Sequence, residues 1–523
     1  MKKNWGMLIA LLALSLPLHA QFRQVKLSEL DLGMYTKSKG NGFAVTIPVT
    51  PNIGNDTRGA VLRIPKEKLG GKEIVIQAEM RTNNVASDAV GGHVGAKILI
   101  VSTGSTGGNF YDFSSSAVGT TPWKKVTAKC SVPPDGLEKM TIIFGIQQGW
   151  GTVEFRNIRI KIAEKERLLG FRTPEGFRCQ YSHAVKNQPM MRGFMTPIPR
   201  LITEKDIRDM AVDWNANLIR YQIVDGVDYK DIQGYKKWMA SCLDKLDTLM
   251  PALKKYNMKV VIDMHMPPGG RYRDSLVFGT AGGEAASEYA QEGNRFLMFD
   301  RKEYRKAFID TWKQIAARYK GNPQVYGYDL VNEPVLQSDA PFNWLRIQYD
   351  AARAIRQIDP ETPIIVESNF WCSPGRYDLM EPFPLKNIIY QIHMYAPGEF
   401  THQGVHNEEY SNAYPAKATA YHTLGLNREK FRDIVQTTID FQNKYGAKIF
   451  VGEFSAAVWA PGAAAYLDEV IKLFEEEKWD WTYHAFREWN GWSLEHEGPP
   501  SDVRPSADND RKQVILKYLK LNK

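Results

Sequence analysis

Strand-like and helix-like segments alternate from residue 166 to residue 523, and this alternation restricts the possible folds more than any other feature of the sequence. Helical patterns of apolar residues, such as the one from Tyr235 to Tyr256, separate the strand-like runs. Eight parallel strands that each lead into a helix close into a barrel. We therefore predict a (β/α)8 TIM barrel of the α/β class. Its strand-like runs end near Met195, Ile223, His265, Glu333, Ser368, Tyr395, Phe454 and Phe486.

The first part of the chain, from residue 21 to residue 165, has an all-β pattern. Its strand-like segments are short and separated by clusters of Gly, Asn, Ser and Pro: 73–80, 96–102, 123–130, 140–146 and 151–162. This spacing is typical of a β-sandwich or jelly roll. The charged stretch from Lys161 to Arg167 is not rich in Pro or Ser, so we expect a short, stiff connection to the barrel domain, residues 166–523.

The first twenty residues have the features of a secretory signal peptide. Lys2 and Lys3 precede an apolar run from Met7 to Leu16, and a Leu-His-Ala sequence ends at Ala20. The apolar run is too short to span a membrane. The residue directly after Ala20 is Gln21 rather than a cysteine, so a lipid anchor is not indicated. We expect cleavage after Ala20 and a secreted or periplasmic mature protein without a membrane span.

Charge and cysteine content argue against several classes of partner. The formal net charge of +8 falls to +6 without Lys2 and Lys3, and basic and acidic residues are interspersed. Such a pattern argues against nucleic acid and anionic membranes as targets. The four cysteines are far apart and lack the spacing of metal ligands. We expect Cys130 and Cys242 to be buried free thiols, and the protein to be a monomer.

Two strand-like runs deliver a glutamate to the same end of the predicted barrel. The run YGYDLVNEP (Tyr326 to Pro334) contains Glu333, and the run KIFVGEF (Lys448 to Phe454) contains Glu453. The carboxyl ends of the strands form the active-site face of such barrels, so carboxylates there indicate catalysis. A single glutamate could merely end its strand in water. A pair of carboxylates on one face is what hydrolysis of a glycosidic bond requires.

The barrel resembles glycoside hydrolase family five, the cellulase-type family of retaining glycosidases, over roughly residues 190 to 520. Asn332-Glu333-Pro334 matches the acid/base motif that follows strand four in that family, and Glu453 matches its nucleophile at the end of strand seven. The resemblance implies further substrate-binding residues at other strand ends, namely Arg220 (strand two), His265 (strand three), His393 and Tyr395 (strand six) and an aromatic residue of the strand-eight region, assigned to Trp489.

The two glutamates need different environments for retaining hydrolysis. One carboxylate attacks the anomeric carbon and the other protonates the leaving oxygen, with the two carboxyl groups about 5–5.5 Å apart. Glu453 must stay ionised, which Arg220 and the Tyr395 hydroxyl can promote. Glu333 must hold a proton, so we expect it to be partly desolvated and close to a second negative charge.

Asn332 and two histidines complete the predicted polar lining. Asn332 can hold the sugar 2-hydroxyl, a contact that strengthens in the transition state. We expect His265 and His393 to bind sugar hydroxyls or to position the carboxylates. His393, His402 and His406 lie close together in the sequence, which could suggest a metal site, but nothing fixes their geometry and His393 already has a place in the barrel motif. We expect no metal and no cofactor.

Two connections are too long for simple turns and leave from the catalytic face. They run from Pro267 to Asp300 and from Ala396 to Asn427, and we expect them to wall the cleft. Tyr272, Trp371 and Phe400 are candidate platforms for sugar rings, whose C–H faces are apolar.

The N-terminal region carries a second, looser resemblance. The string from Trp123 to Ile160 resembles the final strands of carbohydrate-binding, galactose-binding-like jelly rolls. Tyr111 or Trp150 could stack on a sugar ring, or could equally be core or rim residues. The module could therefore bind polysaccharide, or it could brace the barrel.

We predict a secreted retaining β-glycosidase that acts on a polysaccharide or oligosaccharide, specifically an endo-β-1,4-glucanase that hydrolyses cellulose-like or mixed-linkage glucans. Mannanase, xyloglucanase and exo-acting glycosidase remain alternatives, because the fold does not choose among them. A non-catalytic glycan-binding protein and a surface adhesin are alternatives from other classes. The former does not require so complete a set of polar strand-end residues, and the latter does not explain the paired carboxylates.

Overall fold

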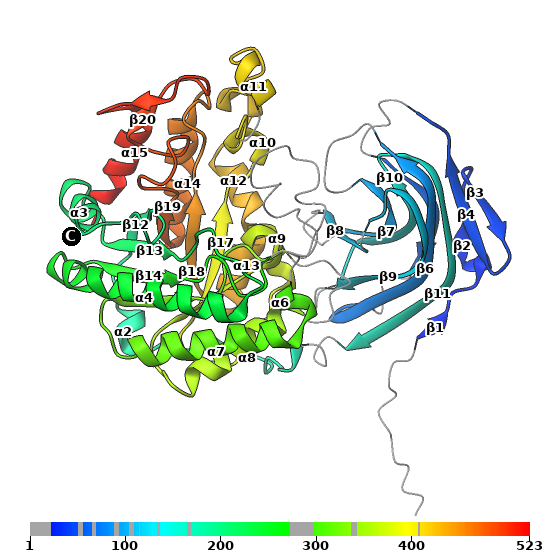
Figure 1. The fold of residues 1–523 in the computed structure, drawn as a ribbon, viewed down its shortest axis with the longest axis horizontal. Coiled ribbons are helices and arrows are strands. Elements are labelled where there is room, and N and C mark those ends of the chain that lie inside the picture. The colour runs from blue at the N-terminus through cyan, green and yellow to red at the C-terminus, as the bar shows by residue number, and fades with distance from the viewer. Residues whose placement is uncertain are drawn as a thin grey trace, which may run out of the picture.

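The computed structural model contains an all-β region followed by a (β/α)8 barrel, and Figure 1 shows the two as separate groups of elements. The structure describes residues 22–50, 56–64, 69–87, 94–103, 109–114, 116–132, 136–164, 169–271, 297–335, 343–405 and 408–522. The predicted signal peptide, residues 1–20, lies outside the described residues.

Two antiparallel sheets form the N-terminal region, as expected for an all-β module. One has the order β3-β4-β11-β6-β9, with β1 paired to β11, and the other has the order β2-β5-β10-β7-β8. The strands are β1 (Arg23–Gln24), β2 (Leu30–Asp31), β3 (Thr36–Lys39), β4 (Gly42–Ile47), β5 (Thr57–Arg63), β6 (Lys72–Ala86), β7 (Gly95–Thr103), β8 (Asn109–Phe113), β9 (Gly119–Ser131), β10 (Lys139–Gln147) and β11 (Trp150–Glu164). Alternate residues of both sheets, such as Ile76 and Ile98, share one apolar core.

Eight parallel strands close into a barrel in chain order, which confirms the predicted fold class. The strands are β12 (Arg192–Met195), β13 (Leu218–Gln222), β14 (Lys259–Asp263), β15 (Val325–Asp329), β16 (Ile364–Glu367), β17 (Ile388–Met394), β18 (Lys448–Phe454) and β19 (Asp480–Tyr483). Closure is made by β19, which pairs in parallel with β12. Nearly every strand residue is buried, because the strands lie between a filled interior and a ring of helices.

Helices surround the barrel in Figure 1. They are α2 (His183–Lys186), α3 (Glu204–Arg208), α4 (Ile232–Lys255), α6 (Leu297–Asp300), α7 (Lys302–Tyr319), α8 (Trp344–Arg356), α9 (Asn369–Cys372), α10 (Gly398–Thr401), α11 (Glu408–Ala413), α12 (Arg428–Ile434), α13 (Gln436–Tyr445), α14 (Ala463–Glu477) and α15 (Asp510–Leu519). The capping-box pattern seen in the sequence begins α3, where the Thr203 hydroxyl accepts from the Asp206 N–H and the Asp206 carboxylate accepts from the Thr203 N–H.

The inward-facing side chains of the barrel change from apolar to polar toward the carboxyl ends of the strands. The lower interior is filled by Met191, Leu218, Val261, Tyr326, Ile365, Ile389 and Phe450. Two residues further along four of these strands, the side-chain alternation of a β-strand places a polar layer made of Arg220, Asp263, Glu367 and Gln391. The next step upward reaches His265 and His393. The alternation of side chains along the strands therefore places the polar layers of the site above the apolar interior of the barrel.

Two strands end earlier than the sequence predicted. β15 stops at Asp329 rather than near Glu333, and β19 stops at Tyr483 rather than near Phe486. Glu333 has a φ of 46°, in the left-handed region that a strand does not accommodate. The chain therefore leaves β15 before this residue, and Glu333 reaches the site from the turn after the strand.

All four cysteines are free thiols, and Cys130 and Cys242 are buried as predicted. Cys372 is also buried, and its Sγ–H donates to the Gln391 carbonyl oxygen at 3.0 Å. Among the described helices, none combines the length and the apolar composition needed to cross a membrane.

Candidate active site

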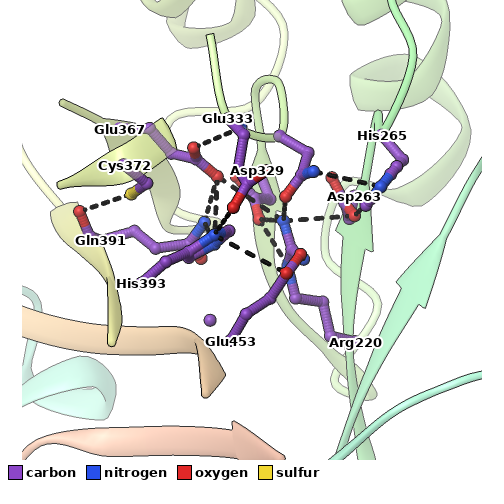
Figure 2. Close-up of polar contacts among 12 residues, drawn as sticks. Arg220, Asp263, His265, Asp329, Glu333, Glu367, Cys372, Gln391, His393 and Glu453 are labelled. Carbon is purple, nitrogen blue, oxygen red and sulfur yellow. Dashed lines mark hydrogen bonds and ion pairs between the residues drawn. The ribbon is translucent and has the colours of Figure 1, made fainter. Parts of the chain in front are cut away.

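A fully buried cation, Arg220, lies at the centre of the polar layer, as Figure 2 shows. Its guanidinium faces four carboxylates. Nη1 donates to Glu453 Oε1 at 2.7 Å and Nε donates to Asp329 Oδ2 at 2.9 Å. Nη2 lies 3.2 Å from Asp263 Oδ2 and 3.5 Å from Glu367 Oε1. A buried charge is tolerated when it is paired and hydrogen-bonded, so these contacts tie the strand ends together around Arg220.

Three of these carboxylates bind protons more tightly than usual. Burial raises the pKa of Asp263 to about 7, although Arg220 opposes the shift. Burial also raises the pKa of Asp329 to about 7, and it raises the pKa of Glu367 well above its ordinary value. One guanidinium does not balance four buried anions, so burial favours the protonated form of Asp263, Asp329 and Glu367.

Asn332 is held on both sides by protein groups. Its Oδ1 accepts from Arg220 Nη2 at 2.9 Å, and its Nδ2 donates to His265 Nε2 at 3.0 Å. His265 Nδ1 in turn lies 2.9 Å from Asp263 Oδ2. Burial, with Arg271 nearby, holds the pKa of His265 well below its ordinary value, so the ring is neutral and donates from Nδ1. His265 therefore positions Asn332, which has one amide N–H left for a sugar hydroxyl.

Glu453 is the carboxylate best prepared to stay ionised. Besides Arg220, it accepts from the Tyr395 hydroxyl at 3.0 Å through Oε2. Burial alone would raise the pKa of Glu453, but its cationic neighbours, among them His484 and Arg220, outweigh burial and hold that pKa well below its ordinary value. The structure thus brings Glu453, Arg220 and Tyr395 together in the way that the sequence predicted.

Glu333 lies across His393 from Glu453. His393 Nδ1 is 2.8 Å from Glu333 Oε1 and 3.7 Å from Glu453 Oε2. One oxygen of each carboxylate and one ring nitrogen of His393 all lie within 4.8 Å of one another. The Glu333 side chain is 15% exposed, and its backbone N–H donates to Glu367 Oε2 at 2.7 Å. As expected, Glu333 is partly removed from solvent, and a second carboxylate, Glu453, lies close to it.

A hydrogen-bonded chain leads from Glu453 toward the surface. The Tyr395 hydroxyl lies 2.6 Å from His484 Nδ1, and His484 Nε2 lies 2.8 Å from Glu488 Oε2. Because the Tyr395 proton goes to Glu453, both His484 nitrogens face acceptors and both carry hydrogen. Burial would lower the pKa of His484, but Glu488 and then Glu453 outweigh it and raise the pKa to about 9. His484 is therefore an imidazolium near neutral pH.

We expect Glu488→Gln to lower the pKa of His484, because it removes the strongest neighbour that favours the charged ring. The wild-type pKa is raised, so the stability that this pair contributes is present below about pH 6.5 and is lost as the pH rises through about 9. NMR titration of the imidazole is the measurement. Glu495→Gln is the matched control, because Glu495 pairs with Arg487 instead. An unchanged His484 pKa in Glu488→Gln would refute the pairing.

The aromatic residue assigned to the strand-eight region belongs to a group of aromatic rings beside the polar cluster. Trp489 is 37% exposed and packs edge-on against Trp459 and Trp492. Trp492 in turn lies 5.9 Å from His484, between ring centroids. His484, which directly follows β19, is the strand-eight side chain that reaches Tyr395.

The other candidate platforms differ in exposure. Trp371 is 41% exposed, just after β16. Phe400 is fully buried against Tyr421 and Tyr466, so the expectation that it is a platform is wrong. Tyr272 lies outside the described residues. In the N-terminal region, Tyr111 is 48% exposed and Trp150 packs partly buried against the core.

Two groups of side chains have the composition of a metal site within the described residues. One is the Glu333, His393 and Glu453 set, and the other is Glu367, Cys372 and His393. In the second group the Gln391 Nε2 already donates to Glu367 Oε1 and lies 3.3 Å from His393 Nε2. Neither group includes His402, which packs against Tyr395, and His406 lies outside the described residues.

Sequence reasoning missed five polar residues of the site. They are Asp263, Asp329, Glu367, Gln391 and His484. The three carboxylates had a usable signal, because each is the last residue of an apolar strand, in VVID, YGYD and IIVE, just as Glu453 lies at the end of its strand. His484 had no such signal once strand eight was taken to run to Phe486.

Comparison with known proteins assigns the barrel to a family. The family model described as cellulase (glycosyl hydrolase family 5) matches residues 182–491. Endoglucanase C of Acetivibrio thermocellus is 28% identical over 300 residues, which cover 53% of this chain and 79% of that protein. Cellodextrinase A of Ruminococcus flavefaciens is 26% identical over 288 residues, 53% of this chain and 76% of that protein. A solved structure of Thermotoga maritima Cel5A in complex with cellobiose is 21% identical, with a TM-score of 0.46 over 63% of this chain and 98% of that chain. The family model covers more than half of the chain, and the chain therefore belongs to glycosyl hydrolase family 5 and is a glycoside hydrolase.

Proposed function

We propose that the protein is a retaining endo-β-1,4-glucanase with Glu453 as the nucleophile and Glu333 as the acid/base. The observation that carries the mechanism is the closeness of the two carboxylates: one oxygen of each lies within 4.8 Å of the other and of a His393 ring nitrogen. Inverting enzymes need a larger gap, about 6.5–9.5 Å, to admit a water between the carboxylate and the sugar.

The first step forms a glycosyl-enzyme. A Glu453 oxygen attacks the anomeric carbon, the bond from this carbon to the leaving oxygen breaks, and Glu333 gives its proton to that oxygen. Arg220 and Tyr395 orient Glu453 and keep it ionised before the attack. The free N–H of the Asn332 amide is placed to donate to the sugar 2-hydroxyl.

The second step regenerates the enzyme. Once Glu453 is esterified its charge is gone, so the now ionised Glu333 lies in a less negative environment and serves as a base toward water. The water oxygen attacks the anomeric carbon, Glu333 takes the proton, and the ester bond to Glu453 breaks. The anomeric configuration is retained because the carbon is inverted twice.

The glucan substrate is supported by the names of the relatives, two of which are an endoglucanase and a cellodextrinase. Mannan, xyloglucan and exo-acting hydrolysis remain the alternatives, because fold and catalytic residues are shared across such activities. We also propose that the protein is exported after cleavage at Ala20, which N-terminal sequencing of the mature protein tests. The N-terminal region either binds polysaccharide or braces the barrel.

A polysaccharide panel with the mature chain tests the proposed substrate. We expect ladders of oligosaccharides from carboxymethylcellulose and mixed-linkage β-glucan, and NMR should show the first product as the β-anomer. Ladders from mannan or xyloglucan alone would replace the substrate and keep the mechanism. Single sugars released from chain ends would indicate exo action, and an initial α-anomer would refute retention.

A further inference from the structure

Two buried polar residues below the catalytic pair have no part in the mechanism described so far. Glu367 ends β16 and Gln391 lies in β17, and the two are partners in the parallel register of these strands. Both are fully buried, and both point into the barrel interior beside His393 (Figure 2). Their contacts determine which nitrogen of His393 carries a hydrogen.

The Gln391 amide group fixes the donor and acceptor roles of its neighbours. Its Nε2 donates to Glu367 Oε1 and lies 3.3 Å from His393 Nε2. An amide nitrogen offers only hydrogens, so His393 Nε2 must be an acceptor without a hydrogen of its own. The single ring hydrogen of His393 is then on Nδ1, which lies 2.8 Å from Glu333 Oε1.

Glu367 is held firmly enough to orient the amide. Its backbone N–H donates to Gln348 Oε1 at 2.9 Å, and its carbonyl oxygen accepts from Gln348 Nε2 and Trp344 Nε1. Its Oε2 accepts from the Glu333 backbone N–H, which supports the left-handed conformation of that residue. Glu367 therefore contacts Glu333 directly, through the Glu333 backbone N–H. It is also connected to the Glu333 side chain through Gln391 and His393.

Gly452 makes room for the amide. A Cβ at this position would lie 2.5 Å from Gln391 Oε1. The register between β17 and β18 shifts at this point, pairing Ile392 with Val451 and His393 with Glu453. The glycine thus serves both as the extra residue that aligns His393 with Glu453 and as the gap that the Gln391 side chain fills.

We propose that Glu367 and Gln391 are positioning residues that keep His393 as a neutral Nδ1–H donor to Glu333 Oε1. Because Oε1 accepts this hydrogen, the proton that Glu333 transfers to the leaving group sits on Oε2, the oxygen free to face the substrate. The inference rests on the proposed acid/base role of Glu333.

The matched test is Gln391→Met, which keeps the side-chain length and removes the amide. Glu367 Oε1, 3.8 Å from His393 Nε2, then becomes the nearest acceptor for a ring hydrogen. We expect the His393 hydrogen to move to Nε2 and the Glu333 proton to turn to Oε1, toward Nδ1. Turnover of glucan should fall about 10- to 100-fold, a part of what general acid catalysis contributes, while an activated aryl glycoside should be affected little.

The direct readout is the His393 tautomer, from 15N NMR of the histidine-labelled protein, with the resonance assigned by its loss in His393→Gln. Tyr377→Phe is the control, because the Tyr377 hydroxyl donates to the Gln391 backbone oxygen and not to its amide. We expect wild type and control to carry hydrogen on Nδ1 alone. Two outcomes would overturn the proposal. One is a wild-type His393 ring with hydrogen on Nε2, whether or not Nδ1 also carries one. The other is an unchanged tautomer in Gln391→Met. If Gln391→Met does not fold, the wild-type spectrum still shows whether His393 carries hydrogen on Nδ1 alone. Failure of the acid/base role itself would instead show as equal losses on both substrates in Glu333→Ala.

Discussion

Replacing Glu453 with alanine abolishes hydrolysis of both glucans and activated aryl glycosides, with kcat reduced by about 10⁵-fold or more. The loss does not depend on the leaving group, because no carboxylate remains to form the ester on which both steps depend. Kinetics on carboxymethylcellulose and on an aryl β-cellobioside measure it. Arg220 keeps its hydrogen bond to Asp329, so the fold should survive, as thermal unfolding can verify.

Azide provides the control that separates a nucleophile from a mere binding residue. In Glu453→Ala the small anion can enter the vacated space and attack the anomeric carbon once, giving the α-glycosyl azide from an activated β-glycoside. Formation of the β-glycosyl azide would contradict the assignment of Glu453. So would a gain in activity with azide that yields neither the α- nor the β-glycosyl azide. Glu453→Gln, which keeps the volume, should be equally inactive without azide.

The barrel was predictable because its strands are buried on both sides. A run such as β17 (Ile388–Met394) is buried at every residue, and such runs stand out between amphipathic helices like α4. The carboxyl end of each strand then follows from the chain direction alone. For that reason Glu333 and Glu453 could be placed on one face before any coordinates were known, and the resemblance to glycoside hydrolase family five added Arg220 and His393.

The parts of the site that sequence reasoning missed are those that depend on contacts between strands. A carboxylate inside an apolar strand is unfavourable by itself, and Asp329 or Glu367 is tolerated only because Arg220 reaches both of them from a third strand. No local sequence pattern predicts this contact of Arg220 with Asp329 and Glu367. The position of Glu333 was recognised from its motif, but its left-handed backbone and its support by Glu367 were not.

The strand-eight region contains a polar residue that the argument from resemblance did not include. An aromatic residue was expected there, and Trp489 was chosen from the available tryptophans. The strand ends at Tyr483, so the first side chain to leave it is His484, which bonds Tyr395 and Glu488. Strand length, set by where the backbone turns, decides which residue faces the site.

Replacing Glu333 with alanine should give losses that depend on the leaving group. Hydrolysis of glucan should fall by about 10²–10⁴-fold, the usual contribution of general acid catalysis, because the sugar leaving group must be protonated as its bond breaks. An activated aryl glycoside needs little protonation, so its first step should survive and the glycosyl-enzyme should accumulate. A burst of phenol followed by slow turnover, measured by stopped-flow absorbance, is the expected signature.

Azide should accelerate that slow phase, since an anion needs no base to attack the ester at Glu453, and the product should be the β-glycosyl azide. This is the opposite anomer from the Glu453→Ala product, so the same reagent assigns both carboxylates. Equal losses on glucan and aryl glycoside would contradict the acid/base role. Loss of the burst with an intact fold would mean that Glu333 is needed to form the ester, and the roles of Glu333 and Glu453 would have to be exchanged or abandoned. One oxygen of Glu333 lies within 4.8 Å of one oxygen of Glu453, so the distance is the same whichever carboxylate attacks, and the two variants decide which one does.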